Sequence, residues 1–120
     1  MNYTLFLDVW VSALNANSRQ ALHDLWAPYD VATPETLDTI YDMACGGIRK
    51  IREAIGLSRI SFSESYGISC RTIEDWEAGR RTPPAYINTL LAYAVLTDVL
   101  AMRKEFVPVH TRPLSPETSL

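Results

Sequence analysis

The chain of 120 residues is long enough for one ordinary domain, or for a small domain with an extension. Its hydrophobic content of 48% and charged content of 21% are those of a globular protein, which excludes a wholly disordered chain. The net charge of −3 is unevenly spread: residues 1–45 hold one basic and six acidic residues, whereas residues 46–104 hold nine basic and six acidic residues. This asymmetry predicts two surfaces with different roles.

Three features of the sequence together predict a cytoplasmic protein, and they concern a secretory leader, a membrane span and the spacing of the cysteines. We expect no secretory leader and no stretch long and apolar enough to cross a bilayer. Cys45 and Cys70 lack the C-x-x-C spacing of a metal site, so we expect reduced thiols, with a disulfide between them as the alternative. His23 and His110 are isolated, so we expect no metal and no cofactor.

Residues 3–14 are dense in aromatic and aliphatic types. Four of them keep helical spacing: Phe6, Val9, Trp10 and Leu14. The β-branched and aromatic content would also suit a short strand. We expect a helix.

Two further helices are predicted before the middle of the chain. Ser18 can cap a helix that Pro28 ends at Ala27, because proline disfavours a helical residue before it. Thr33 and Pro34 supply a capping hydroxyl and a first-turn proline for the next helix.

Gly46–Gly47 marks a joint between this N-terminal part and the rest of the chain. The helix predicted for residues 48–55 buries its isoleucines and turns Arg49, Lys50 and Arg52 outward. The basic half of the chain thus begins with an amphipathic helix.

The stretch 57–84 predicts two short helices joined by a tight turn. Ser58 and Ser69 can each cap a helix, and Gly67 between them ends the first helix where a left-handed residue is needed. Five residues are expected to supply apolar contacts: Ile60, Phe62, Ile68, Ile73 and Trp76. Two helices joined in this way indicate a helix-turn-helix.

The motif resembles the Cro/C1-type, or XRE, family of phage-repressor helix-turn-helix domains, which also occurs in antitoxins. The matching residues are Leu57, Ser58, Phe62, Gly67, Ile68, Ser69, Thr72, Ile73, Trp76, Glu77, Gly79, Arg80 and Pro83. The resemblance covers about half the chain. It implies an all-α fold with a five-helix bundle at 46–106. The helical patterns of residues 1–45 predict an N-terminal helical extension, and the prolines and low apolar content of residues 107–120 predict a flexible, disordered tail.

A long helix is predicted after the motif. Thr82 can cap it, Pro83 and Pro84 open it, and it runs to about Arg103. Its apolar residues go nearly all the way round, so it must be covered on all sides. One side can pack on the helix-turn-helix, and the other must meet the N-terminal helices, a second subunit, or both.

The resemblance implies that the helix at 69–78 enters the major groove of double-stranded DNA. The candidates for base contact are Cys70, Arg71 and Asp75. The candidates for backbone or flanking contact are Arg59, Ser69, Thr72, Glu74, Arg80 and Arg81.

Arg71 is the strongest base-contact candidate, because its fork matches the two acceptors of guanine. Asp75 could accept from a cytosine amine or orient Arg71; alternatively the two form only a surface ion pair. The family usually has glutamine at the position of Arg59, where it commonly contacts a phosphate. Glu77 is expected to bond internally, since DNA would repel it.

No arrangement of Ser, His or acidic residues predicts catalysis, so we expect a protein that is not an enzyme. One hypothesis is a homodimeric repressor that binds a palindromic operator of its own operon. The alternative is an antitoxin or phage anti-defence protein, whose acidic residues 1–45 neutralise a basic toxin or host protein, with the helix-turn-helix giving autoregulation.

Overall fold

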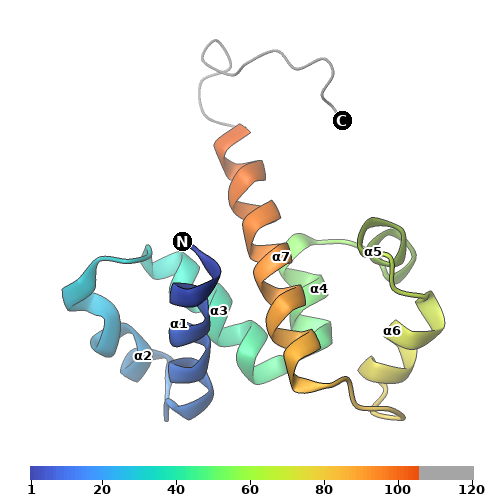
Figure 1. Ribbon diagram of the computed structural model, residues 1–120, viewed down its shortest axis with the longest axis horizontal. Helices are drawn as coiled ribbons and strands as arrows, with labels where there is room; N and C mark the ends of the chain where they lie inside the picture. Colours follow the sequence, from blue (N-terminus) through green and yellow to red (C-terminus); the bar gives the residue numbers. More distant parts are fainter. Residues whose placement is uncertain (106–120) are drawn as a thin grey trace.

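The computed structural model describes residues 1–105, and over this range the protein is helical, with no strand (Figure 1). The elements are α1 (Tyr3–Asn15), α2 (Arg19–Trp26), the 3₁₀ turn η1 (Ala27–Tyr29), α3 (Pro34–Gly46), α4 (Ile48–Ile55), α5 (Arg59–Tyr66), α6 (Cys70–Glu77) and α7 (Ala85–Glu105). The predicted all-α class is confirmed for these residues. The tail predicted at 107–120 lies outside them.

The ambiguous segment near the N-terminus is helix α1. The Asn2 side chain caps it by accepting a 2.9 Å hydrogen bond from the N–H of Leu5. Its buried side chains recur at helical spacing: Phe6, Val9, Trp10 and Ala13. Leu14 was predicted on this face but is exposed, because Ala13 completes the buried stripe and the next residue turns away by about 100°.

Local caps start α2 and α3 where the sequence predicts. The Ser18 hydroxyl accepts a 3.1 Å bond from the N–H of Ala21, and the Thr33 hydroxyl accepts a 3.1 Å bond from the N–H of Thr36. Helix α4 ends at Gly56, whose φ of 73° is a left-handed conformation that a side chain would strain.

Two predicted helix ends are shifted by prolines. Helix α7 begins at Ala85 and not directly after a Thr82 cap, because Pro84 disfavours the helical conformation of Pro83. Helix α2 ends at Trp26, one residue earlier than predicted, and the 3₁₀ turn η1 follows it.

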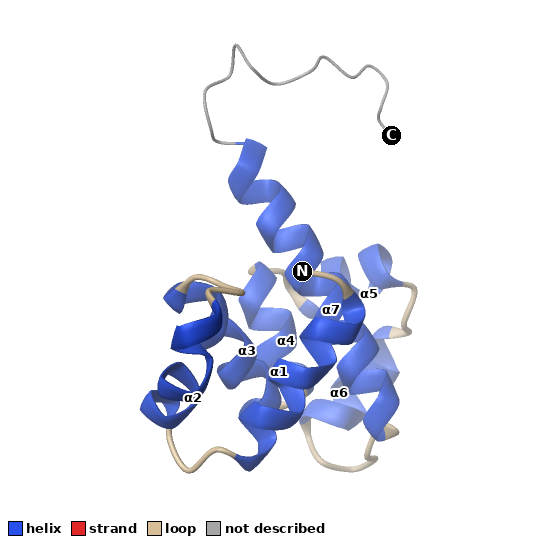
Figure 2. Ribbon diagram, turned by 60° about the vertical axis from the view of Figure 1, so that its left-hand side comes forward, coloured by secondary structure: helices blue, strands red, loops and turns tan. Residues whose placement is uncertain are grey.

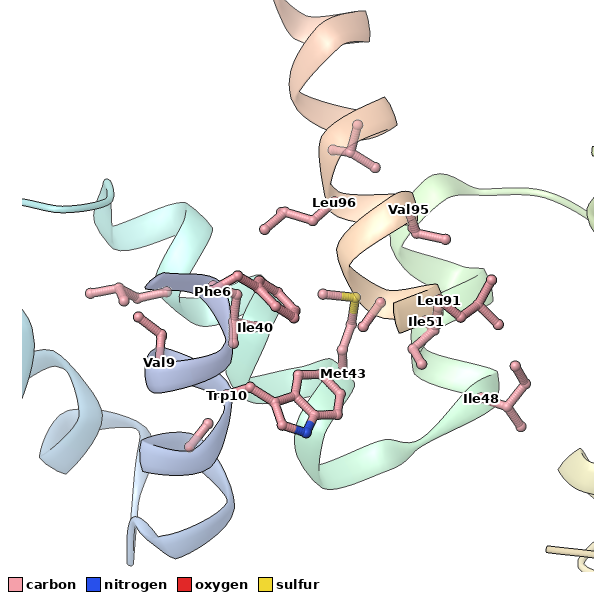
Figure 3. Close-up of a cluster of buried hydrophobic side chains, with 14 of the residues drawn as sticks. Phe6, Val9, Trp10, Ile40, Met43, Ile48, Ile51, Leu91, Val95 and Leu96 are labelled. Carbon is pink, nitrogen blue, oxygen red and sulfur yellow. The ribbon is translucent and has the colours of Figure 1, made fainter. Parts of the chain in front are cut away.

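In Figure 1 helix α7 stands between α1, α2 and α3 on one side and α4, α5 and α6 on the other, and Figure 2 shows the same helices with α1 and α2 brought forward. Helix α7 packs against α4 and against α1 and α3. The buried side chains form one cluster across these helices (Figure 3). Phe6, Ile40, Met43, Ile51 and Val95 within it are completely buried. The core therefore continues across the glycine joint at 46–47.

By length and composition alone, α7 could cross a membrane, with a mean hydropathy of 1.5 over Ala85–Arg103. The expectation that no stretch is long and apolar enough is therefore wrong. In the folded chain 33% of the most apolar window is buried, where α7 packs on the core. Core helices of folded proteins have the same composition, so this feature is weak evidence for a membrane span.

Candidate nucleic-acid interface

Helices α5 and α6 are the two short helices of the motif, joined by residues 67–69. The Ser58 hydroxyl caps α5 by accepting from the N–H of Ser61, and the Ser69 hydroxyl caps α6 by accepting from the N–H of Thr72, each at 3.1 Å. Gly67 has a φ of 70°, which lets the chain leave α5 without strain. Local chemistry thus sets where α6 begins.

The inner faces of α5 and α6 are anchored in the core. Phe62 and Ile73 are completely buried. The Tyr66 hydroxyl donates a 2.7 Å hydrogen bond to Asp98, which links α5 to α7; burial and this bond raise the pKa of Tyr66. Ile60 was predicted to supply an apolar contact, but it is exposed. It lies two residues before Phe62 and so points away from the core.

Glu77, at the end of α6, is a buried carboxylate held by arginines. Its side chain is 1% exposed. Arg52 of α4 donates to both of its oxygens, at 2.7 and 3.1 Å, and to the carbonyl of Leu57 at 2.9 Å. The Nε of Arg59 lies 3.1 Å from Oε1, and the Nε of Arg49 lies 3.6 Å from it. Burial raises the pKa of Glu77, but the bonds from Arg52 and Arg59 outweigh it, so the pKa lies below its ordinary value.

Asp75 organises a second group of arginines. Its side chain is 9% exposed and accepts from the Nε of Arg80 at 2.8 Å and from the Nε of Arg71 at 3.3 Å, while Arg81 approaches to 3.9 Å. The bond from Arg80 lowers the pKa of Asp75 despite the opposing effect of burial. The contact between Asp75 and Arg71 fits both the orienting role and the plain ion pair predicted as its alternative. Whether Asp75 also reads a base stays a prediction.

The remaining predicted contact residues lie at the start of α6 or along it. Arg71 projects furthest, with 79% of its side chain exposed. Ser69 and Thr72 are joined by a 2.8 Å hydroxyl hydrogen bond at the cap. Cys70 is half-buried, and its thiol lies 3.8 Å from the exposed carboxylate of Glu74. Arg71 is therefore the long side chain best placed to leave the protein surface.

Sequence reasoning missed the roles of two arginines of α4. Arg52 was predicted to point outward, but its side chain is 15% exposed and bound to Glu77. Arg49 is exposed, and it reaches the same carboxylate. The internal bond predicted for Glu77 is confirmed. Because a buried carboxylate needs a basic partner, that prediction could have pointed to an arginine packed against α6.

The side chains that could support other chemistry are dispersed. Cys45 and Cys70 are free thiols. His23 bonds to Asp38 at 2.7 Å. Within residues 1–105, no three His, Cys, Asp or Glu side chains come together as metal ligands. The arginine groups around Glu77 and Asp75 are therefore the most organised polar feature of this region.

No protein-family model, curated protein or solved structure matches this chain. A functional conclusion consequently rests on the side-chain geometry of α4, α5 and α6. The resemblance of the motif to Cro/C1-type domains stays a sequence-based prediction.

Acidic conditions are expected to destabilise the fold through Glu77 and Asp75. Both pKa values lie below the ordinary 4.5 and 3.8, so the unfolded chain binds protons at a higher pH than the folded chain. Their stabilisation is complete above the unfolded pKa values and is lost as the pH falls through the lowered, folded ones. Melting temperatures measured from neutral pH to about pH 3 should fall below about pH 4.5. The melting temperature of Glu77→Gln should fall less steeply with pH than that of the wild type. An equally steep fall would contradict the role given to Glu77 in acid destabilisation.

Proposed function

We propose that the protein is a sequence-specific DNA-binding transcriptional regulator, which acts as a dimeric repressor of its own operon. Helix α6 would lie in the major groove and Arg71 would read a base edge. The finer fold is then the Cro/C1-type five-helix bundle. Residues 46–105 hold four of its helices, α4 to α7, so the fifth helix predicted within 46–106 is not found among the described residues.

The observation that carries this proposal is the exposed Arg71 at the start of α6. Its Nε donates a 3.3 Å hydrogen bond to Asp75, and 79% of its side chain is exposed, so the outer edge of the guanidinium can meet a ligand. A guanidinium that is held at one edge and free at the other suits bidentate recognition of guanine.

The charge around α6 supports the same proposal. Six arginines surround the two carboxylates, so the cluster carries a net charge of four positive units. The arginines are Arg49, Arg52, Arg59, Arg71, Arg80 and Arg81. The chain as a whole has a net charge of −3, so this concentration is local. A basic surface around an exposed helix start is the electrostatic pattern of DNA binding.

The direct test is binding to the protein's own upstream DNA, compared with a scrambled duplex over a series of salt concentrations. A specific regulator should prefer the upstream fragment by at least about a thousandfold. Equal binding to both duplexes at every salt concentration would contradict the proposed function.

A second copy of the chain is proposed to dock on the exposed apolar residues of α1 and α7. Leu7, Val11 and Leu14 follow one another along α1, and Tyr86 and Leu90 along α7. Helices α1 and α7 contact each other, and α7 has no charged residue between positions 85 and 97. Two copies that meet through this part of α7 therefore bring no like charges of α7 together. A two-fold dimer is also what a palindromic pair of half-sites requires.

Leu90→Glu is expected to weaken this dimer at least about tenfold, because burying an unpaired carboxylate costs more than about 1.4 kcal/mol. Sedimentation equilibrium measures the change. Leu25→Glu on α2 is the matched control, since Leu25 is 54% exposed and Leu90 is 49% exposed. A wild-type protein that stays monomeric while bound to its operator would contradict the dimer.

Neutralisation of a protein partner by residues 1–45 is the second hypothesis, and we rank it lower. Arg19 binds Asp38 at 3.4 Å and Asp42 at 2.8 Å, so part of the acidic charge is already paired within the chain. The expected partner would be a basic toxin or host enzyme. A pull-down from the source organism that recovers no such protein would count against it.

A further inference from the structure

A surface hollow of about 410 Å³ opens where the end of α4, the end of α5 and the last turns of α7 come together. Its apolar walls come from both sides of this junction: Ile55, Leu57, Ala101 and Met102. Small-molecule sites in proteins have volumes of about 300–1,000 Å³ and are mainly apolar, with a few polar groups that orient the ligand. The hollow therefore has the size and the lining of a site for a small ligand.

The carboxylate in the lining of this hollow is Asp98, and a phenol holds it. The Tyr66 hydroxyl donates a 2.7 Å hydrogen bond to Oδ2 of Asp98. Burial and this bond raise the pKa of Tyr66, so the hydroxyl keeps its proton at neutral pH and remains a donor. Among the side chains that the structure describes, no cation pairs with Asp98. Oδ1 of Asp98 thus remains an acceptor without a charged partner.

The chemistry of the hollow selects for an organic cation. None of its lining residues is basic, so an anion finds no partner there. A Ca²⁺ or Mg²⁺ ion takes six or more oxygen ligands, whereas the lining supplies a single carboxylate. An ammonium group can donate to Oδ1 of Asp98, and the aromatic ring of Tyr66 also attracts a cation. An apolar group attached to the ammonium can then cover Leu57 and Met102.

We propose that this hollow binds a small organic cation, a primary amine that carries an aromatic or aliphatic group. The inference goes beyond the proposed function, because none of the predicted DNA contacts lines the hollow. Tyr66 belongs to α5 and Asp98 to α7. The bound amine therefore contacts both helices beside the hydrogen bond that joins them.

The test titrates the full chain with phenethylamine and, separately, with phenethyl alcohol, its neutral counterpart. Backbone amide signals of Ser65, Tyr66 and Ala101 are followed by NMR. The amine should saturate these signals and bind about fivefold more tightly than the alcohol, the upper end for an ion pair that faces solvent. Equal affinity for the two probes, or signals that do not respond to either, would overturn the proposal.

Asp98→Asn should remove the preference for the amine and leave the affinity for the alcohol unchanged. Asp98 is exposed, and the asparagine oxygen can still accept from Tyr66, so the fold should be retained and thermal melting checks it. Asp8→Asn is the matched control, because Asp8 is an exposed carboxylate between the exposed Leu7 and Val11 of α1 and lies outside the hollow. A preference that persists in Asp98→Asn, or that is lost equally in Asp8→Asn, would overturn the site.

Met102→Gln tests the apolar half of the site. Met102 is 48% exposed, so this variant should fold, and it should bind the amine and the alcohol several-fold more weakly, because both probes lose the same apolar wall. Unchanged affinity for both probes would place their rings elsewhere and would overturn the proposal.

Two other occupants of the hollow give different results in the same titration. Residues 106–120 contain Arg112, a cation that could meet Asp98 in place of an amine. Binding of the amine only in Arg112→Gln would assign the hollow to this segment of the chain. An affinity for the amine that falls as the protein concentration rises would assign the hollow to a second copy. Either result would overturn the proposal of a small amine.

Discussion

Glu77→Gln is expected to lower the free energy of unfolding by about 3–5 kcal/mol, the range for removing one partner of a buried ion pair. The Glu77 side chain is 1% exposed and Arg52 is 15% exposed, so water cannot replace the lost carboxylate. Arg52 would retain its charge but lose the carboxylate; the glutamine offers one neutral amide oxygen beside the Leu57 carbonyl, and its NH₂ group faces the guanidinium groups as a second donor. Arg59 would lose its anchor as well. The loss therefore combines an unpaired charge with a loosened junction of α4, α5 and α6.

Urea denaturation measures this loss, provided that the denaturant slope is unchanged between variants. Glu53→Gln is the control, because Glu53 forms an exposed pair with Lys50 at 3.4 Å and should change stability by less than about 1 kcal/mol. If Glu77→Gln costs no more than this control, the central structural role of Glu77 is wrong.

Arg71→Ala is expected to reduce affinity for the operator by about 1–3 kcal/mol, or roughly 5- to 150-fold, the contribution of one bidentate base contact. Binding to scrambled DNA should change little, because the variant keeps the other arginines around Asp75 and Glu77. The fold should be retained, since the Arg71 side chain is 79% exposed. Electrophoretic mobility shifts with both duplexes at two salt concentrations measure the difference.

Arg81→Ala is the matched control for Arg71. Arg81 is also exposed, and it approaches Asp75 to only 3.9 Å. Arg81 is a candidate for contact with the DNA backbone, so Arg81→Ala should weaken binding to operator and scrambled DNA alike. The ratio of the two affinities should stay unchanged. Equal losses on both duplexes for Arg71→Ala would instead make Arg71 a phosphate contact and would remove the proposed base reading.

Most element positions could be predicted from the sequence because they depend on local chemistry. Ser18, Thr33, Ser58 and Ser69 each accept a backbone N–H within three residues, so a cap and the helix that follows it are encoded together. Gly67 has a positive φ that other residues rarely adopt. The candidate helix α6 and the exposure of Arg71 follow from the same short stretch.

The ends near prolines were harder to predict, because two local preferences compete there. Thr82 is a good cap and Pro83 a good first residue, but Pro84 acts against Pro83, and α7 starts only at Ala85. The helical state of α1 was likewise undecided by composition. The helical state is stabilised by tertiary packing, because the rings of Tyr3 and Phe6 each lie with their centroids 5.2 Å from that of Tyr93 of α7.

The sequence by itself determined the caps of α2 and α3, the short helices of the motif and the strongest base-contact candidate, and it favoured a helix over a strand for residues 3–14. Only the tertiary structure decided which arginine meets which carboxylate. Arg52 and Glu77 are 25 residues apart, and their contact depends on how α4 packs against α6. Helical periodicity places Arg52 four residues after Ile48, at the edge of the isoleucine face of α4, but it cannot say that α6 covers that edge. Long-range packing therefore turned a predicted surface charge into a buried one and brought Arg49 and Arg59 to the same carboxylate.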